Sequence, residues 1–317
     1  MKSLPRLLVL AIILAGLGAG AWYATRGTAP ERRNLDALVT VGGDVVRDVT
    51  HPALDLTRLS TAEEIALGQA IDAEVRAGIP VGGDPAAEIY VQNVLRLVAG
   101  GVSRRDIPYA VAMVRSPEVN AFAVAGGRLY VTDGMLGFMR SEAELAAVLG
   151  HEIGHVELGH CVQRLQIEQA ARRVAPDLAG LARLGYEIME RGFSEEQELA
   201  ADGQGALLAA RAGYDAWQAS QLFSRFLAKE TAGTRPPTRN PVKIAVTAVP
   251  QALDRYLKTH PPADQRIEAV RRALVSRGDL WAGTPRYVGI GNLTARRARS
   301  DDPRPGEWIA RDRAPSP

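Results

Sequence analysis

The motif His-Glu-Ile-Gly-His at residues 151–155 is the part of this sequence whose residue types and spacing best suit chemistry. On a helix, at about 100° per residue, His151 and His155 lie about 40° apart, so both imidazoles can bind one zinc ion. Glu152 lies about 100° round from His151, beside that ion, where its carboxylate can act as a general base. The motif therefore predicts two zinc ligands and a base.

A catalytic zinc ion also needs a third protein ligand and an open position for water. His160 is the nearest further histidine, but it does not fit the metzincin pattern HExxHxxGxxH. That pattern requires glycine and histidine where this chain has Leu158 and Cys161. A continuing helix would also put His160 about 180° from His151. We therefore expect His160 at a helix end or behind a ligand, and not on the metal.

The acidic start of the helix predicted after Ser194 offers a better third ligand. Glu198 and Asp202 are four residues apart, so both carboxylates face the same way. One can bind zinc while the other accepts the free N–H of a zinc-bound histidine. Alternatively, these acids only complement the helix dipole, which accounts for Glu195 and Glu196 but not for Asp202 among its apolar neighbours.

Mainly helical segments must position these residues. Two runs are typical of strands, 109–114 and 121–131, and Gly126-Gly127 favours a hairpin within the second. The composition of 231–241 predicts a loop. This order of elements predicts an α+β domain, mainly helical with a small β-sheet, and not a βαβ succession. Caps and periodicity predict helices over 60–77, 84–99, 141–160, 161–192, 194–212 and 263–277.

The composition limits which partners the chain can bind and which side chains can hold a metal. The 317 residues include 38 basic and 36 acidic side chains, a net charge of +2, so no nucleic-acid partner is indicated. The single cysteine, Cys161, excludes an intramolecular disulfide framework and a multi-thiolate metal site. We expect it to be a small buried residue and not a nucleophile. Any metal must then be held by histidine, aspartate or glutamate.

The N-terminus carries an export signal. Two basic residues precede an uncharged apolar run from Leu7 to Ala24, which is typical of a signal peptide or of a single membrane anchor. The rest of the chain is therefore expected outside the cytoplasm. The predicted parts are a signal peptide or signal anchor (1–25), a linker (26–58), a catalytic domain (59–277) and an Arg/Pro-rich disordered tail (278–317).

Five short motifs between about residues 60 and 275 follow one another in an order typical of one protein family. They are Asn120-Ala121-Phe122-Ala123, the HEIGH motif, the SEEQELAAD segment that begins at Ser194, Ala212-Gly213-Tyr214-Asp215, and Thr259-His260-Pro261 with Arg266-Ile267. Together they resemble the HtpX and CAAX-prenyl endopeptidase family of zinc metalloproteases, peptidase family M48. At most one spanning helix is predicted, so the chain is most similar to the single-signal, extracytoplasmic branch of that family.

The resemblance implies a gluzincin metalloprotease domain with one Zn²⁺ per chain. His151, His155 and Glu198 would be its ligands, and Glu152 the general base. Asp202 would accept a hydrogen bond from a ligating histidine.

The resemblance also gives an expected role to residues outside the HEIGH motif. His260 and Arg266 would lie near the catalytic centre, where they could stabilise the oxyanion. The alternative is that His260 only begins a helix and Arg266 forms a structural ion pair. A substrate would add as an extended strand, since a sheet edge binds any backbone, against Asn120, Ala121, Phe122 and Ala123.

These inferences predict a zinc-dependent metalloendopeptidase that hydrolyses misfolded or damaged envelope proteins. We expect it in the bacterial periplasm, in contact with a membrane only if the N-terminal segment is retained. The alternative is a zinc-stabilised chaperone or assembly factor of the envelope, with latched or lost proteolytic activity. A complete ligand set does not distinguish the two.

Overall fold

The computed structural model describes residues 59–172, 192–233 and 260–310. Four predictions concern residues outside these ranges: the export segment and linker, the second half of the helix over 161–192, most of the loop over 231–241, and the last residues of the tail. Within the described ranges, no helix is both long enough and apolar enough to cross a bilayer.

The chain is mainly helical with a small three-stranded sheet, which confirms the predicted fold class. Helix starts follow the cap signals: the capping boxes of Ser60 with Glu63 and Ser194 with Gln197 are both formed. The helices are α3 (Thr61–Gly78), α4 (Pro85–Ala99), α5 (Asp133–Phe138), α6 (Glu142–Glu157), α7 (His160–Arg172), α9 (Glu195–Arg211), α10 (Gln218–Gly233), α12 (Ala263–Ser276), α13 (Ile290–Ala295) and the short turns η1 (Ala125–Gly127), η3 (Gly278–Leu280) and η4 (Pro305–Glu307). The strands are β1 (Ala110–Val114), β2 (Ala121–Val124), β3 (Arg128–Thr132), β4 (Arg286–Tyr287) and β5 (Trp308–Ile309).

The three-stranded sheet has the order β1-β3-β2, with β1 parallel and β2 antiparallel to β3. The predicted hairpin is confirmed: η1 joins β2 to β3, and Gly126 (φ 72°) and Gly127 (φ 79°) supply its left-handed backbone. The outer edge of β1 is covered, because Gly82 donates to the carbonyl of Met113. This leaves β2 as the other edge strand of the sheet.

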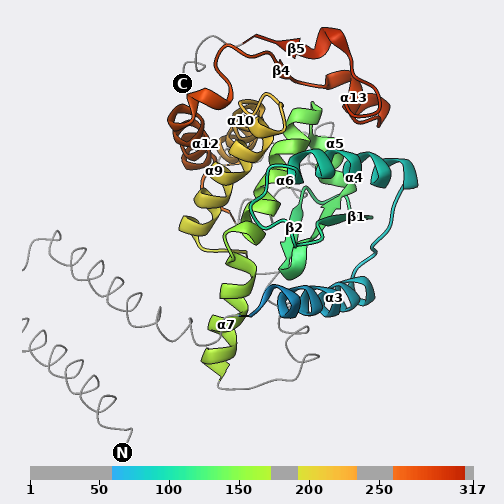
Figure 1. The fold of residues 1–317 in the computed structure, drawn as a ribbon, viewed down its shortest axis with the longest axis vertical. Helices are drawn as coiled ribbons and strands as arrows, with labels where there is room; N and C mark the ends of the chain where they lie inside the picture. The colour runs from blue at the N-terminus through green and yellow to red at the C-terminus, as the bar shows by residue number, and fades with distance from the viewer. Residues whose placement is uncertain (1–58, 173–191, 234–259, 311–317) are drawn as a thin grey trace, which may run out of the picture. The chain divides into compact units, whose positions relative to one another are not determined.

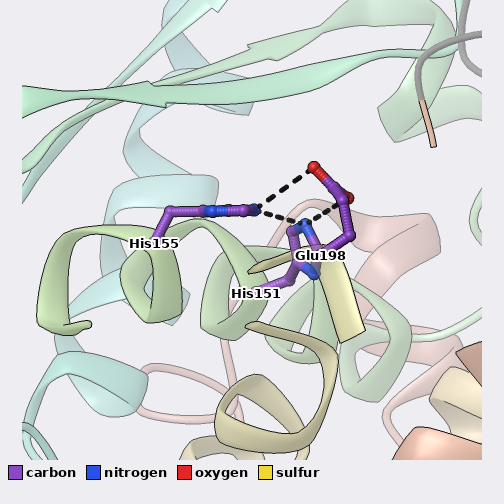
Figure 2. Close-up of side chains that lie close together, drawn as sticks. All are labelled: His151, His155 and Glu198. Carbon is purple, nitrogen blue, oxygen red and sulfur yellow. Dashed lines mark hydrogen bonds and ion pairs between the residues drawn. The ribbon is translucent and has the colours of Figure 1, made fainter. Parts of the chain in front are cut away.

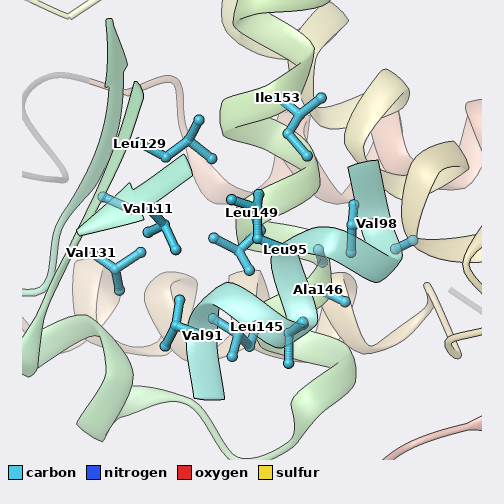
Figure 3. Packing of buried hydrophobic residues seen from close by; sticks show 14 of the residues in the cluster. Val91, Leu95, Val98, Val111, Leu129, Val131, Leu145, Ala146, Leu149 and Ile153 are labelled. Carbon is cyan, nitrogen blue, oxygen red and sulfur yellow. The ribbon is translucent and has the colours of Figure 1, made fainter. Parts of the chain in front are cut away.

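Helix α6 is the centre of the fold (Figure 1), with α4 and the sheet on one side and α9, α10 and α12 on the other. Most of its residues are buried around the whole circumference, as expected for a helix enclosed by other elements. Figure 3 shows how its side chains meet those of α4, β1 and β3 in one core. The labelled core residues are Leu145, Ala146, Leu149 and Ile153 from α6, Val91, Leu95 and Val98 from α4, Val111 from β1, and Leu129 and Val131 from β3.

The helix predicted over 141–160 ends earlier than expected. Leu158 is the C-cap of α6, and Gly159 adopts a left-handed conformation with φ of 74°. Such a glycine terminates a helix by capping its last carbonyl groups. His160 then begins a separate helix, α7, so the prediction that it faces away from His151 on a continuous helix does not apply.

The prediction of a disordered tail is wrong for residues 278–310, which form η3, β4, α13, η4 and β5. The carbonyl groups of Val288 and Gly289 accept the N–H groups of Ala143 and Glu142, so this segment satisfies the first donors of α6. The Arg299 guanidinium lies 4.4 Å from the Tyr214 ring and also faces two aromatic rings of the segment itself. The Arg/Pro-rich composition predicts disorder, but in the folded chain the stacking of Arg299 on aromatic rings orders this segment.

Candidate active site

Two helices with touching backbones form the base of the site. A Cβ atom at Gly150 of α6 would lie 2.6 Å from the carbonyl oxygen of Gly205 on α9. A Cβ atom at Gly205 would lie 2.4 Å from the backbone nitrogen of His151. Only glycines permit this approach, and it brings the acidic first turns of α9 against the histidines of α6.

Three potential ligand atoms meet where these helices touch (Figure 2): the Nε2 atoms of His151 and His155 and the carboxylate of Glu198. The two Nε2 atoms are 3.1 Å apart. A carboxylate oxygen of Glu198 lies 3.5 Å from Nε2 of His151, and the other lies 3.7 Å from Nε2 of His155. The fold therefore brings the three predicted ligands together, although 43 positions separate His155 from Glu198 in the chain.

The donor set fits a zinc ion. Tetrahedral ligands about 2.0–2.1 Å from one zinc ion lie about 3.3–3.4 Å from each other, close to the separations observed here. All three side chains are buried, and Oε2 of Glu198 makes no hydrogen bond to any described group. Burial raises the pKa of Glu198, although His151 and Arg266 oppose the shift. A buried carboxylate oxygen without a donor is the expected signature of a cation site.

The second ring nitrogen of His151 is held by an ion pair. Its Nδ1 lies 2.8 Å from Oδ1 of Asp202, and Arg266 of α12 donates to both oxygens of Asp202 at 2.8 and 2.6 Å. Burial alone would lower the pKa of His151, but the Asp202 carboxylate outweighs it and the pKa is raised. Burial likewise works against ionised Asp202, yet Arg266 holds the pKa of Asp202 below its ordinary value. This arrangement fixes the imidazole with Nε2 toward the other ligands.

The other ligand histidine has different neighbours. Nδ1 of His155 lies 3.0 Å from Nδ1 of His160, and the Phe193 ring stacks on the imidazole with centroids 3.9 Å apart. Burial lowers the pKa of His155 well below its ordinary value and lowers the pKa of His160 to about 4. Both rings are therefore neutral at neutral pH. His160 lies behind a ligand histidine, as the break after α6 allows.

Glu152 is buried beside the ligand atoms, 4 % exposed. Burial raises its pKa to about 7, although the neighbouring His151 acts in the opposite direction. The backbone N–H of Ala123 hydrogen-bonds to its carboxyl group. A carboxyl group with a pKa near neutrality, next to a metal site, is suited to general acid–base catalysis.

The ligand atoms and Glu152 open into a cleft of about 230 Å³. Strand β2 forms one wall: Asn120, Ala121 and Phe122 line the cleft, whereas Ala123 is buried behind it. Asn120 accepts from the backbone of Thr132 on β3, so by alternation Phe122 also faces β3 and the backbone groups of Ala121 and Ala123 point the other way. Ala121 is therefore the position of β2 at which an extended backbone can pair.

His260 also lines the cleft, whereas Arg266 does not. Nε2 of His260 lies 3.5 Å from Oε2 of Glu198, and its ring centroid is 6.3 Å from that of His151. Arg266 lines a second, smaller cavity behind His151 and packs 4.3 Å from the Phe223 ring. Of the two roles considered for Arg266, the geometry matches the structural ion pair.

Cys161 is buried beside β2, with Sγ 3.8 Å from the carbonyl oxygen of Ala123. Burial raises the pKa of this thiol, and nearby Glu152 adds to the shift. The thiol is protonated at neutral pH, so it lacks the thiolate that a nucleophile needs.

Sequence reasoning missed Phe193 at this site. The only sequence signal is its place directly before the N-cap Ser194, where an apolar residue commonly packs against the helix that follows. That rule predicts a contact with α9 itself. It does not predict the contact with His155 of α6 that the fold makes.

Comparisons with known proteins give one consistent result. The model described as "Peptidase family M48" matches residues 85–274. Three curated relatives are the "Beta-barrel assembly-enhancing protease" of Yersinia pestis (28% identical, 83% of this chain, 52% of the relative), the "Mitochondrial metalloendopeptidase OMA1" of Schizosaccharomyces pombe (30%, 45% and 44%) and the "Metalloprotease LoiP" of Escherichia coli (33%, 37% and 52%). The chain spans about half the length of the curated relatives that it matches most strongly.

Proposed function

We propose that this chain, which belongs to peptidase family M48, a family of metalloproteases, is a zinc-dependent metalloendopeptidase. One observation carries the proposal: the ligand atoms of His151, His155 and Glu198 converge beside Glu152 at the wall of an open cleft. A structural zinc site would use four protein ligands and be closed. Three ligands facing a cleft support a catalytic site.

The proposed catalytic steps are divided between the zinc ion, Glu152 and Asp202. When bound, zinc lowers the pKa of a water ligand toward about 7 and polarises a carbonyl group. Glu152 takes the proton of the attacking water and then delivers it to the leaving amine. Asp202 keeps the Nδ1 proton of His151 in place throughout, so that Nε2 remains free to bind.

The substrate is proposed to pair with β2 as an added strand, with its backbone at Ala121. This mode needs only an extended backbone and makes little demand on the substrate's sequence. It favours unfolded or misfolded proteins, whose backbones are accessible, over folded ones. The half-buried Phe122 provides apolar surface in the same cleft.

His260 is proposed to stabilise the oxyanion that develops when the carbonyl group is attacked. Its ring lines the cleft, beside the carboxylate of Glu198. A ring N–H in such a position can donate to the developing charge and lower the barrier. The rival role for His260 is structural, at the start of α12. A His260→Gln variant that keeps full kcat with an unchanged thermal midpoint would support the structural role.

The cellular role is proposed to be removal of misfolded or damaged envelope proteins. Two observations support it: the predicted export segment at residues 1–25, and the likeness to beta-barrel assembly-enhancing proteases. We accordingly propose a periplasmic location, with tethering to the inner membrane if the N-terminal segment is retained. Comparison of envelope proteomes from wild-type cells and cells with the Glu152→Gln variant tests this, since substrates should accumulate only in the variant.

The biochemical test compares the wild-type protein with Glu152→Gln, using unfolded casein as substrate. Both should hold about one zinc ion per chain, and only the wild type should cleave casein. Glu195→Gln, a change at an exposed acid of α9, serves as the matched control and should cleave normally. If the zinc-loaded wild type and the Glu152→Gln variant behave alike on casein and in cells, the chain is better described as a zinc-stabilised chaperone or assembly factor.

A further inference from the structure

Phe193 contacts two of the three proposed metal ligands at once. Its ring stacks on the imidazole of His155 at a centroid distance of 3.9 Å and an interplanar angle of 17°. Its backbone N–H hydrogen-bonds to the carboxylate of Glu198. The residue directly precedes Ser194, the N-cap of α9, so the start of the helix that carries Glu198 fixes its backbone.

His155 needs such a contact more than His151 does. The second torsion of a histidine side chain is broad, so its rotamer alone does not set the direction of the ring. Asp202 and Arg266 set that direction for His151 through charged hydrogen bonds. Nδ1 of His155 instead faces Nδ1 of His160 at 3.0 Å, a single imidazole in place of a buried ion pair.

We propose that Phe193 is a positioning residue of the metal centre, whose ring holds the His155 imidazole in the plane from which Nε2 binds zinc. The inference rests on zinc binding as proposed above. With the Phe193 ring parallel to the imidazole at van der Waals distance, His155 cannot turn about its second torsion without displacing the aromatic ring.

The position of Phe193 in the cleft gives the ring a second effect. Phe193 lines the same cleft as the ligands and is half-buried. The guanidinium carbon of Arg164 on α7 lies 5.7 Å from the centroid of the Phe193 ring. The ring therefore covers one face of the His155 imidazole within the cleft. An apolar cover of this kind strengthens metal–ligand interactions because it excludes competing water.

The test measures zinc affinity by competition with a chelating dye, so it does not depend on proteolysis. Phe193→Leu removes the flat ring but keeps an apolar side chain, and should weaken zinc binding about 10-fold to 100-fold. Phe193→Tyr retains the stack and should bind zinc within about twofold of the wild type. Phe122→Leu is the matched control: its ring lines the same cleft but stacks on Tyr130, and its loss should leave zinc affinity unchanged.

Cobalt substitution adds a readout that a purely structural role would not change. The visible absorption of bound Co²⁺ depends on ligand geometry, so Phe193→Leu should alter the spectrum while Phe193→Tyr preserves it. Thermal midpoints of the zinc-free variants identify any general loss of stability.

The possible outcomes are distinct. Wild-type affinity and an unchanged cobalt spectrum in Phe193→Leu would overturn the inference about Phe193 and leave the proposed function intact. Equal weakening in Phe193→Leu and Phe193→Tyr would overturn it as well, because the stack would not be the cause. A wild-type chain that binds no zinc would overturn both proposals.

Discussion

His151 and His155 lie one turn apart on α6 and point toward the same spot, yet the chain supports them in opposite ways. His151 is held by charge, through Asp202 and the buried guanidinium of Arg266. His155 is held by a neutral imidazole and an aromatic ring. We call these two arrangements the charged support and the neutral support.

The difference has an energetic meaning. Both members of the charged support are almost completely buried, so removing either charge takes away the opposite charge that offsets the other. The neutral support has no such constraint, since each of its contacts can weaken alone. The charged support should therefore affect folding and metal binding together, whereas the neutral support should affect mainly metal binding.

The largest expected effect comes from removing the carboxylate of the charged support. Asp202→Ala removes the carboxylate that offsets the charge of the Arg266 guanidinium, which is 1 % exposed, and should lower the free energy of unfolding by about 3–5 kcal/mol. Urea denaturation of the zinc-free protein measures this. The control is Arg271→Ala, which breaks an exposed ion pair with Glu268 and should leave the urea midpoint almost unchanged. Equal losses of stability in the two variants would show that the buried ion pair contributes no more to folding than an exposed one.

A second experiment asks whether the two charges act as a unit. The Arg266→Met change alone should also destabilise the fold, because it leaves Asp202 with His151 as its remaining partner. The double variant should lose less stability than the two single variants combined, by about 1–3 kcal/mol, since it removes both buried charges together. Strict additivity in a double-mutant cycle would mean that Asp202 and Arg266 contribute independently.

A smaller effect is expected in the neutral support. His160→Leu removes the ring nitrogen that faces Nδ1 of His155 and should weaken zinc binding about 10-fold. The unfolding midpoint of the zinc-free protein should change much less than in Asp202→Ala. A stability loss as large as that of Asp202→Ala would remove the distinction between the two supports.

The smallest expected effect concerns how the stability of the zinc-free protein depends on pH. The two supports should lose their contributions to stability in different pH ranges. Burial lowers the pKa of His160 to about 4 in the fold, whereas histidine in an unfolded chain titrates at about 6.5. Protons therefore favour unfolding as the pH falls from about 6.5 to about 4, and the neutral support loses its contribution in that range. Asp202, whose pKa is lowered, loses its contribution only below about 3.9, the value in unfolded chains.

Urea midpoints measured from pH 7 to pH 4 test this order. In the wild type the urea midpoint should fall between pH 6.5 and pH 4. In His160→Leu it should fall less over the same range. If the slope in that range is the same in both proteins, His160 is not among the groups that cause it.

Local patterns predicted the parts of the site that are local. Helical spacing put His151 and His155 on one face, and the capping box at Ser194 fixed where α9 begins. The four-residue spacing of Glu198 and Asp202 showed that both carboxylates share a face. These inferences need only the geometry of one helix at a time.

Features that depend on contacts between elements were not predictable in this way. The periodicity around Gly159 is compatible with a continuous helix, and only its left-handed backbone reveals the break. The contact of Phe193 with His155 depends on how α9 packs against α6. Helix α10 was overlooked, and the order in the C-terminal segment arises from rings that meet Arg299 only in the folded chain.

The C-terminal segment determines when, during synthesis, the active-site helix can be completed. The backbone N–H of Arg299 donates to the side chain of Glu142 across a separation of 157 residues, and the neighbouring segment caps the start of α6. Contacts so distant in sequence form late, because a long loop must close first. A growing chain thus carries all the proposed zinc ligands before the helix that presents two of them is capped. Interrupted products that end before residue 288 lack these contacts, so full support of the proposed metal site is confined to chains synthesised beyond Arg299.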